Sequence, residues 1–390
     1  MNYEDLLSDK VKTIKPSGIR KFFDLASQME GVISLGVGEP DFTTPWAIRE
    51  AAIYSIEKGK TFYTANQGLM ELRKEICRYY HRRFNVSYDP TDNCIVTVGG
   101  SEGIDIAIRA IMNPGDEMIV LDPGYVAYVP GVELADGVPV SITLQHENQF
   151  KLTPELLKAA ITPKTKALLI NYPSNPTGGF MTKEDYEKIV PIIKEAGIIV
   201  ISDEVYAELS YEDQFCSIAS FEEIKDQVII VSGFSKAFAM TGWRLGYLLA
   251  NPVLTSAMNK IHQYIIMSAP SAAQYGAIEG LKNCDDEVQK MRESYLTRRN
   301  FLVKTFNDMG LETFKPQGAF YVFPCIKSTG LTSDEFCEQL LDDQKVACVP
   351  GTAFGPAGEG FIRVSYAYSL EELKLATERI ALFVAKKRTQ

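Results

Sequence analysis

The sequence predicts an α/β protein with two parts: a large domain built on a mainly parallel sheet with helices on both faces, and a smaller α+β domain. Between about residues 95 and 250, short apolar runs alternate with longer helical patterns; the runs are CIVTV, EMIVLD, KALLINY, IIVISD and VIIVSG. This rhythm is typical of crossover units that feed a parallel sheet buried on both faces. After residue 284 the pattern changes, which indicates a second unit.

We expect the large domain to span residues 46–283 and the small domain to combine residues 1–45 with residues 284–390. The stretch 285–309 predicts one long amphipathic helix. AFYVFPCI, KVACVP and FIRVSYA predict strands, interleaved with helices at about 332–343 and 369–387. The last helix opens with a capping-box pattern, Ser369-x-x-Glu372.

The composition excludes several classes of protein. A formal net charge of −10 leaves no basic stripe for a nucleic-acid partner. The 7 cysteines are scattered and form no C-x-x-C pair, so we expect neither a disulfide framework nor a metal site, and a reducing cytoplasm fits best. No signal peptide and no run of about 20 apolar residues is seen, so we expect no membrane partner.

Ligands of parallel sheets bind at the carboxyl ends of the strands, and several strand ends here carry unusual residues. CIVTV runs into Gly99, Gly100 and Ser101 and then into a helical pattern. A glycine-rich turn at a helix N-terminus presents free backbone N–H groups and the positive end of the helix dipole, so it suits a phosphate. A plain strand-to-helix turn would show the same pattern.

Two further strand ends supply an amide and a carboxylate. KALLINY is followed by PSNPTGG, where two prolines restrict the backbone around Asn175; this suits an amide that bonds to a ligand, although Asn-Pro is also common in plain turns. IIVISD delivers Asp203, with Tyr206 close behind, to the end of a buried strand. A carboxylate there needs a cationic or donating partner, unless it caps a helix.

The last of these strand ends places Lys236 shortly after the apolar run VIIV. A desolvated ammonium loses its proton more easily, and the amine can form a Schiff base with an aldehyde. A lysine that extends to the surface is the alternative. Together, a phosphate cradle, an amide, a carboxylate and an amine match pyridoxal phosphate, whose phosphate, ring and aldehyde need such groups.

These motifs resemble the class I, fold-type I aminotransferases that depend on pyridoxal phosphate. The stretch GFSKAFAMTGWRLG, residues 233–246, is similar to the lysine signature of that family. The resemblance also includes SLGVGEPDF, TFYTANQG, VGGSEG, NYPSNPTGG, SDEVY, KPQGAFYVFP and GEGFIRVSYA, and so it covers nearly the whole chain.

The resemblance implies how the cofactor is held. Lys236 would carry the cofactor covalently and later move a proton between the substrate α-carbon and the cofactor, while Asp203 would pair with the protonated ring nitrogen. Asn175 and Tyr206 would bond to the 3′ oxygen of the ring. Tyr125 would stack on the ring, at a position where tryptophan is often found. The implied phosphate-binding residues are Gly99, Gly100, Ser101, Ser235 and Arg244.

The resemblance also implies a substrate site and a partner. Arg363 would bind the substrate α-carboxylate, aided by Asn175 and the backbone of Gly38; a structural Asp or Glu is the alternative partner of this arginine. Tyr63 is similar to the tyrosine that reaches the phosphate from a neighbouring subunit, which implies a homodimer with shared sites. A hinge near residues 30–45 would let the small domain close on the substrate.

The implied reaction is a ping-pong transfer of an amino group from an L-amino acid to 2-oxoglutarate. SGIRKFFDLA, SNPTGG, HQY and GAFYVFP most resemble the aromatic amino-acid and acetyl-diaminopimelate aminotransferases. Ser101 stands where one branch of aspartate-using relatives has lysine, which weakens aspartate as the donor. Tyr63, Tyr125 and His262 are candidates to line a pocket for aromatic side chains. N-acetyl-LL-diaminopimelate and aspartate transamination are alternatives, as is a carbon–sulfur β-lyase with the same cofactor.

A hydrolase is the alternative from a different class. Gly99-x-Ser101-x-Gly103 matches a nucleophile elbow, and Asp203 and His262 follow in the hydrolase order. However, His262 falls within a helical pattern, NKIHQYI, and no HGGG-like segment precedes the serine. The context therefore argues against this alternative.

Overall fold

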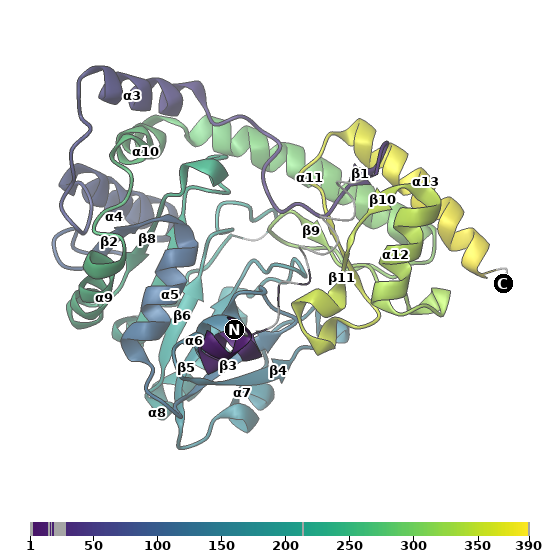
Figure 1. Ribbon diagram of the computed structural model, residues 1–390, viewed down its shortest axis with the longest axis horizontal. Helices are drawn as coiled ribbons and strands as arrows, with labels where there is room; N and C mark the ends of the chain where they lie inside the picture. The colour runs from purple at the N-terminus through teal and green to yellow at the C-terminus, as the bar shows by residue number, and fades with distance from the viewer. Residues whose placement is uncertain (1–2, 15, 17, 19–28, 213, 389–390) are drawn as a thin grey trace.

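The computed structural model describes residues 3–14, 16, 18, 29–212 and 214–388 of the 390-residue chain. Its main sheet has 7 strands in the order β2-β8-β7-β6-β5-β3-β4 (Figure 1). These strands are β2 (Cys94–Thr97), β3 (Glu117–Asp122), β4 (Val138–Thr143), β5 (Thr165–Asn171), β6 (Ile199–Asp203), β7 (Val228–Gly233) and β8 (Gly246–Leu249).

The sheet is mainly parallel, as predicted. β4, β3, β5, β6 and β7 pair in parallel, whereas β8 runs antiparallel to both β7 and β2. The five apolar runs in the sequence correspond to β2, β3, β5, β6 and β7. β4 and β8 were not among the predicted strands.

Helices cover both faces of this sheet, because alternate residues of the strands enter two separate apolar cores. Val200 and Ile230 pack in one core with α4, α8 and α10, while Ile201 and Val231 pack in the other with α5, α6 and α9. The helices are α3 (Trp46–Glu57), α4 (Met70–Phe84), α5 (Gly99–Ile111), α6 (Tyr128–Leu134), α7 (Pro154–Ala160), α8 (Lys183–Ala196), α9 (Pro252–Ile265) and α10 (Ser271–Asn283).

The C-terminal part forms a smaller α+β unit, to the right in Figure 1. A three-stranded antiparallel sheet has the order β11-β12-β9, and β1 pairs in parallel with β10. The elements are β1 (Ile33–Ser34), α11 (Asp285–Asp308), β9 (Tyr321–Val322), α12 (Ser333–Gln344), β10 (Val346–Ala347), β11 (Val349–Pro350), β12 (Ile362–Ser365) and α13 (Leu370–Arg388). The α/β fold class with a smaller α+β part is therefore confirmed.

Individual predictions for this part hold with one difference. The long helix appears as α11, and Ser369 and Glu372 exchange the hydrogen bonds of a capping box ahead of α13. The strands are shorter than the apolar runs: only Tyr321–Val322 of AFYVFPCI lies in a strand. The domain boundaries at residues 45/46 and 283/284 stay a prediction.

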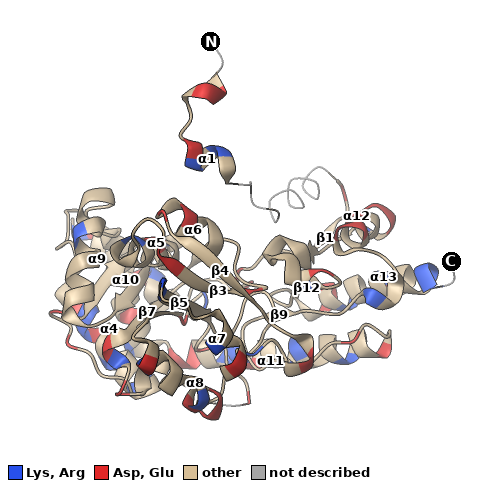
Figure 2. Ribbon diagram, turned by 90° about the horizontal axis from the view of Figure 1, so that it is seen from below, with Lys and Arg blue, Asp and Glu red and all other residues tan. Residues whose placement is uncertain are grey.

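Short elements complete the description. α1 (Asp9–Thr13) lies outside the main body, and Lys and Arg are interspersed with Asp and Glu over the helices (Figure 2). The 3-10 turns are η1 (Tyr3–Leu6), η2 (His146–Asn148), η3 (Ile218–Ser220), η4 (Lys225–Gln227), η5 (Thr241–Trp243), η6 (Lys327–Thr329), η7 (Gly351–Phe354) and η8 (Pro356–Gly358). Among the described residues, none of the helices has the length and apolar character needed to cross a membrane.

Candidate active site

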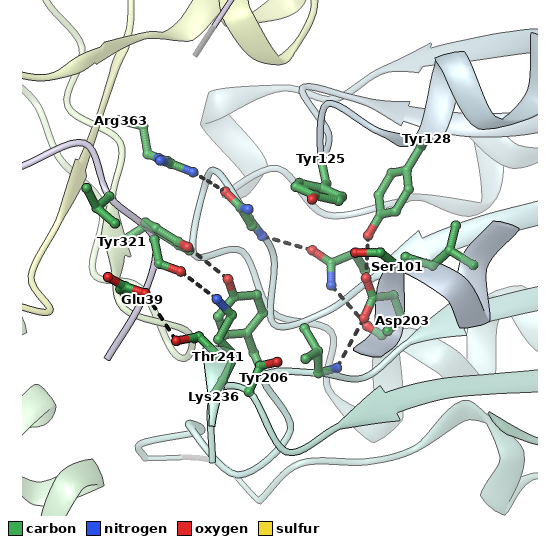
Figure 3. A pocket seen from close by; sticks show the side chains of 18 of the residues that line it. Glu39, Ser101, Tyr125, Tyr128, Asp203, Tyr206, Lys236, Thr241, Tyr321 and Arg363 are labelled. Carbon is green, nitrogen blue, oxygen red and sulfur yellow. Dashed lines mark hydrogen bonds between the residues drawn. The ribbon is translucent and has the colours of Figure 1, made fainter. Parts of the chain in front are cut away.

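A cavity of about 380 Å³ lies at the carboxyl ends of β5, β6 and β7, a size typical of small-molecule sites (Figure 3). Its lining includes most of the residues that the sequence singled out. These are Gly38, Gly100, Ser101, Tyr125, Asn175, Asp203, Tyr206, Ser235, Lys236, Arg244 and Arg363. Residues up to 325 positions apart in the chain therefore meet at one edge of the sheet, between Gly38 and Arg363.

Three of the residues that the sequence singled out lie outside this lining: Gly99, Tyr63 and His262. Gly99 sits directly behind Arg244: a Cβ atom at this position would lie 2.8 Å from Nη2 of Arg244, and its φ of +71° favours glycine. Tyr63 is 83% exposed and does not reach the cavity of its own chain.

Lys236 follows β7 and extends into the cavity. Its Nζ donates a hydrogen bond to the carbonyl of Gly38 at 2.5 Å. Burial, followed by the positive charge of Arg363, lowers the pKa of Lys236 to about 8. The neutral amine, which is the nucleophilic form, is therefore far more populated near neutral pH than in a lysine exposed to water.

The segment that follows β1 is fastened to the loop after Lys236. β1 itself pairs with β10, so the chain changes its attachment from the C-terminal part to the lysine loop within a few residues. The hydrogen bonds to the loop are Lys236 Nζ to Gly38 O (2.5 Å), Thr241 Oγ1 to Glu39 Oε2 (3.1 Å), Thr44 Oγ1 to Ala239 O (2.5 Å) and Trp243 Nε1 to Thr44 Oγ1 (3.0 Å).

Asp203 ends β6 and is almost fully buried. The hydroxyl of Tyr128 donates to its Oδ2 at 2.7 Å, and the backbone N–H of Val205 donates to its Oδ1 at 3.2 Å. Burial raises the pKa of Asp203 to about 6, and these two donors oppose the rise. No described helix begins at Asp203, so the helix-cap interpretation does not apply.

Tyr128 and Tyr321 are the main lining residues that the sequence reasoning missed. Tyr128 lies in the first turn of α6, three residues after Tyr125, and the two rings meet edge to face. The hydroxyl of Tyr321 lies 2.8 Å from that of Tyr206. Tyr321 belongs to the motif GAFYVFP, so the motif was recognised but its tyrosine was not singled out.

Arg363 is 3% exposed and yet has no carboxylate partner among the described residues. Its Nη1 donates to Oδ1 of Asn175 at 2.8 Å, and its Nη2 donates to the carbonyl of Gly36 at 2.5 Å. Its Nε has no partner. The rings of Tyr321 and Phe354 lie 4.6 and 4.7 Å from the guanidinium carbon and hold the group in place. A buried cation with only neutral acceptors is suited to an anionic ligand.

Asn171, at the end of β5, connects the backbone of Asn175 to the backbone of Asp203. Its Oδ1 accepts from the backbone N–H of Asn175 at 2.9 Å, and its Nδ2 donates to the carbonyl of Asp203 at 3.0 Å. Asn175 and Asp203 are therefore held at a set distance by a side chain between them.

The opposite end of the cavity presents donors and one cation. α5 begins at Gly99, so its first N–H groups have no acceptor within the helix, and Gly100, Ser101, Ser235 and Arg244 line this end of the cavity. A Cβ atom at Gly246 would lie 2.6 Å from the backbone of Gly99, which shows how closely β8 packs behind this turn. The donor set has the composition that a phosphate group requires.

Comparison with known proteins identifies the family. The family model for aminotransferase class I and II matches residues 30–380. The chain belongs to this aminotransferase family. It is 55% identical to the "Putative aminotransferase YugH" of Bacillus subtilis (strain 168), over 97% of this chain and 98% of that protein. It is 44% identical to an aspartate aminotransferase of Pyrococcus abyssi, over 98% of this chain and 99% of that protein.

A solved structure agrees with this assignment. The aromatic aminotransferase of Pyrococcus horikoshii superimposes with a TM-score of 0.91 at 41% identity, covering 95% of this chain and 100% of that chain. The resemblance drawn from the sequence is therefore confirmed at the level of fold and family. Relatives named for aspartate and for aromatic substrates are almost equally similar to this chain. Sequence identity alone therefore does not distinguish an aspartate from an aromatic substrate.

This aminotransferase uses pyridoxal 5′-phosphate, in common with its family. The site fits that group on its own geometry: an amine with a lowered pKa, a buried carboxylate and an anion cradle face one cavity. The substrates of an aminotransferase are amino acids and 2-oxo acids, whose common carboxylate suits the unpaired Nε of Arg363.

His262 does not line the pocket, contrary to the prediction. It lies in α9 with 0% exposure; its Nδ1 is 2.5 Å from Oε1 of Glu102, and its Nε2 is 2.8 Å from the carbonyl of Asn66. Both ring nitrogens thus have partners other than Ser101. The hydrolase alternative is wrong for the same reason, since His262, its proposed base, forms no hydrogen bond to Ser101 and cannot activate this hydroxyl.

Proposed function

We propose that the protein transfers the amino group of an L-amino acid, with an aromatic side chain favoured, to 2-oxoglutarate by a ping-pong mechanism. The observation that carries this proposal is Arg363, a buried guanidinium with neutral partners and an unpaired Nε beside Lys236 and Asp203. A planar fork of donors in this position binds the α-carboxylate that amino acids and oxo acids share. The choice of 2-oxoglutarate as the acceptor follows from the family resemblance.

The residues around the reacting atoms have separate roles. When bound, the cofactor withdraws electrons from the substrate α-carbon through its protonated ring. Asp203 keeps the ring nitrogen protonated, and Tyr128 and Val205 favour the ionised form of this carboxyl. The neutral amine of Lys236 would serve as the base that takes the proton from the substrate α-carbon and as the acid that gives it back.

The remaining roles concern binding. Asn175 and Tyr206 would bond to the ring oxygen, and Tyr125 would pack on the ring. Ser235, Arg244 and the α5 N-terminus with Gly99, Gly100 and Ser101 hold the phosphate. Arg363, with Asn175 and the backbone of Gly38, would hold the substrate carboxylate and so fix the orientation of the α-carbon in the cavity.

The charges in the lining support a neutral donor side chain. The described lining holds three cationic side chains, Lys236, Arg244 and Arg363, and each already has a role in binding or proton transfer. Glu39 adds a negative charge next to Thr241. An aromatic donor ring would meet Tyr125, Tyr206 and Tyr321 in this lining. A side-chain carboxylate, whether on aspartate or on 2-oxoglutarate, would have to find its cation outside this lining.

A homodimer is part of this proposal. Exposed apolar side chains gather on α3, on the loop after it and on α9, at the end of the molecule opposite the small unit (Figure 1). They include Trp46, Ile53, Tyr54, Ile56, Phe62, Tyr63, Val253, Tyr264 and Ile265. An apolar surface of this kind supports a subunit interface, with Tyr63 reaching the phosphate in the partner's cavity.

A half-reaction screen tests the proposed substrates. The holoenzyme is mixed with single amino acids, and loss of the visible absorbance of the lysine-bound cofactor is followed. Phenylalanine or tyrosine should react with a kcat/KM at least about tenfold above that of aspartate, a modest difference for a pocket without a matching charge. A preference for aspartate or N-acetyl-LL-diaminopimelate would contradict the aromatic assignment, and pyruvate release from cystathionine without an oxo acid would indicate the β-lyase.

The role of Arg363 is tested by Arg363→Lys. Loss of the planar fork should raise KM about 100-fold for both the amino acid and the oxo acid, while cofactor content stays normal. Arg299→Lys is the matched control, because Arg299 is equally buried but already pairs with Glu212. This control should lower thermal stability and leave both KM values unchanged. An unaltered KM in Arg363→Lys would contradict the proposed role.

A further inference from the structure

Glu102 places an acidic side chain in the first turn of the helix that forms the anion cradle. Its side chain is 7% exposed, and its Oε2 accepts a hydrogen bond from the backbone N–H of Val98 at 2.5 Å. Ser101, the preceding residue, lines the cavity. A carboxylate near a helix N-terminus stabilises the helix, but a full negative charge there also opposes the binding of a second anion.

His262 compensates the negative charge of Glu102. The carbonyl of Asn66 can only accept a hydrogen bond, so Nε2 of His262 must carry a hydrogen. The short contact between Nδ1 and Oε1 of Glu102 then holds one proton, whichever of the two atoms carries it. In either arrangement the Glu102–His262 pair has no net charge. Both side chains are buried, so water does not take the place of the imidazole as the partner of the carboxylate.

The second N–H of His262 reaches the loop that carries Tyr63. Asn66, whose carbonyl accepts this bond, also donates from its Nδ2 to the carbonyl of Met267 at 2.7 Å, just after α9. Gln274 holds the same loop from α10, through Thr64 at 3.1 Å. The loop is thus connected through one imidazole to the first turn of α5.

We propose that His262 is a positioning residue for the cofactor phosphate. By sharing a proton with Glu102 it removes the net negative charge from the first turn of α5, and with its other nitrogen it holds the Tyr63 loop. This role rests on the proposed placement of the phosphate at the start of α5. His262 touches neither the substrate nor the reacting atoms.

The test is a double-mutant cycle with His262→Gln and Glu102→Gln, read as cofactor affinity of the apoprotein. Each variant is titrated with pyridoxal phosphate and with pyridoxal, which lacks the phosphate. His262→Gln leaves an uncompensated carboxylate beside the phosphate, so its Kd for pyridoxal phosphate should rise at least about tenfold at an effective dielectric constant near 20. Its Kd for pyridoxal should stay within about twofold, because that probe carries no phosphate charge.

The double variant gives the decisive readout. Glu102→Gln removes the charge that His262 compensates, so the double variant should recover most of the affinity for pyridoxal phosphate that His262→Gln loses. A role limited to packing would give the opposite result, since a second core substitution would weaken binding further. The exposed His81→Gln serves as the control, with both affinities expected to match the wild type.

The outcomes separate this inference from the proposed function. If the wild type binds pyridoxal phosphate no more tightly than pyridoxal, the phosphate site itself is misplaced. If the wild type shows the preference but His262→Gln keeps it, or if the double variant is weaker than His262→Gln, the role of His262 is overturned. Should His262→Gln not fold, Glu102→Gln alone suffices: the proposal requires that its preference for pyridoxal phosphate be equal to or above that of the wild type.

Discussion

The end of β6 presents two neighbouring carboxylates to opposite sides of the sheet, and the comparison is instructive. Asp203 faces the cavity, whereas Glu204 faces the core formed with α4. Both are buried, and burial raises both pKa values, to about 6 for Asp203 and about 7 for Glu204. By burial and titration alone, the two would be judged equally suited to catalysis.

Their partners distinguish them. Glu204 accepts hydrogen bonds from three hydroxyls, those of Ser202 (3.0 Å), Ser217 (2.7 Å) and Tyr80 (3.1 Å). Asp203 has one hydroxyl donor and one backbone donor, and its remaining capacity faces open space. A buried carboxylate that the protein satisfies internally is structural, whereas one left with capacity toward a cavity is available to a ligand.

Substitution of Lys236 by alanine should have the largest effect on the cavity side. Without the amine, the covalent link and the proton transfer are both lost, so turnover should fall at least about 10⁵-fold while the fold is kept. Steady-state kinetics and mass spectrometry of the borohydride-reduced peptide measure the two losses. Lys260→Ala, an exposed lysine on α9, is the control. Near-normal activity in Lys236→Ala would remove the basis of the proposed mechanism.

Asp203→Asn should have the second-largest effect. Turnover should fall about 10²- to 10⁴-fold because the ring nitrogen loses its anionic partner. The apoprotein should be at least as resistant to urea as the wild type, since a buried charge has been removed. The comparison predicts this separation of activity from stability. A stability loss as large as the activity loss would instead make Asp203 a structural residue like Glu204.

Tyr128→Phe should have a smaller effect, because only one donor to Asp203 is lost. The pKa of Asp203 should rise, so the carboxylate is less ionised and the acidic limb of the kcat/KM profile should move to higher pH. At pH 7 the loss should be about tenfold, shrinking toward zero at pH 9. A uniform loss at every pH would show that Tyr128 acts by packing instead.

Glu204→Gln should change turnover least, by no more than about threefold. Its main effect should be on the free energy of unfolding. In the wild type, burial raises the pKa of Glu204 from 4.5 to about 7, so this carboxyl is protonated in the folded state and ionised in the unfolded state between these pH values. The free energy of unfolding therefore falls as the pH rises from about 4.5 to about 7. The decline is on the order of 3 kcal/mol for one such group.

The apoprotein of Glu204→Gln should lack this component, and urea unfolding between pH 5 and pH 7.5 measures the difference in slope. Glu195→Gln, on the exposed side of α8, should keep the slope of the wild type. Identical slopes in Glu204→Gln and the wild type would mean that Glu204 does not hold its proton in the folded state.

The sheet was predictable where strands are buried on both faces. β5, β6 and β7 are continuous apolar runs because each contributes to two apolar cores. β4 is an edge strand with alternating exposure and contains Pro139, so its apolar signal is weak. β8 is a four-residue strand close behind the lysine motif, too short for a pattern of its own.

The site was predictable where residues follow strands directly, because parallel strands bring their carboxyl ends together. Asn175, Asp203 and Lys236 meet for this reason. The contact between Tyr128 and Asp203 joins residues 75 positions apart and depends on how α6 packs, which no local pattern records. The same holds for His262, which was predicted to line a pocket for aromatic side chains but whose partner, Glu102, lies 160 positions away.

The hydrogen bonds that hold the segment after β1 to the loop after Lys236 have a practical consequence. The chain has 2 tryptophans, and both lie at this attachment: Trp46 directly follows the segment, and Trp243 belongs to the loop that binds it. The indole N–H of Trp243 bonds to Thr44, and the guanidinium of Arg49 covers the ring of Trp46 at 5.0 Å. Any displacement of the segment during substrate binding would alter the surroundings of both indoles. Intrinsic fluorescence thus offers a label-free optical signal from this one crossing point, with no competing fluorophore of the same kind elsewhere in the chain.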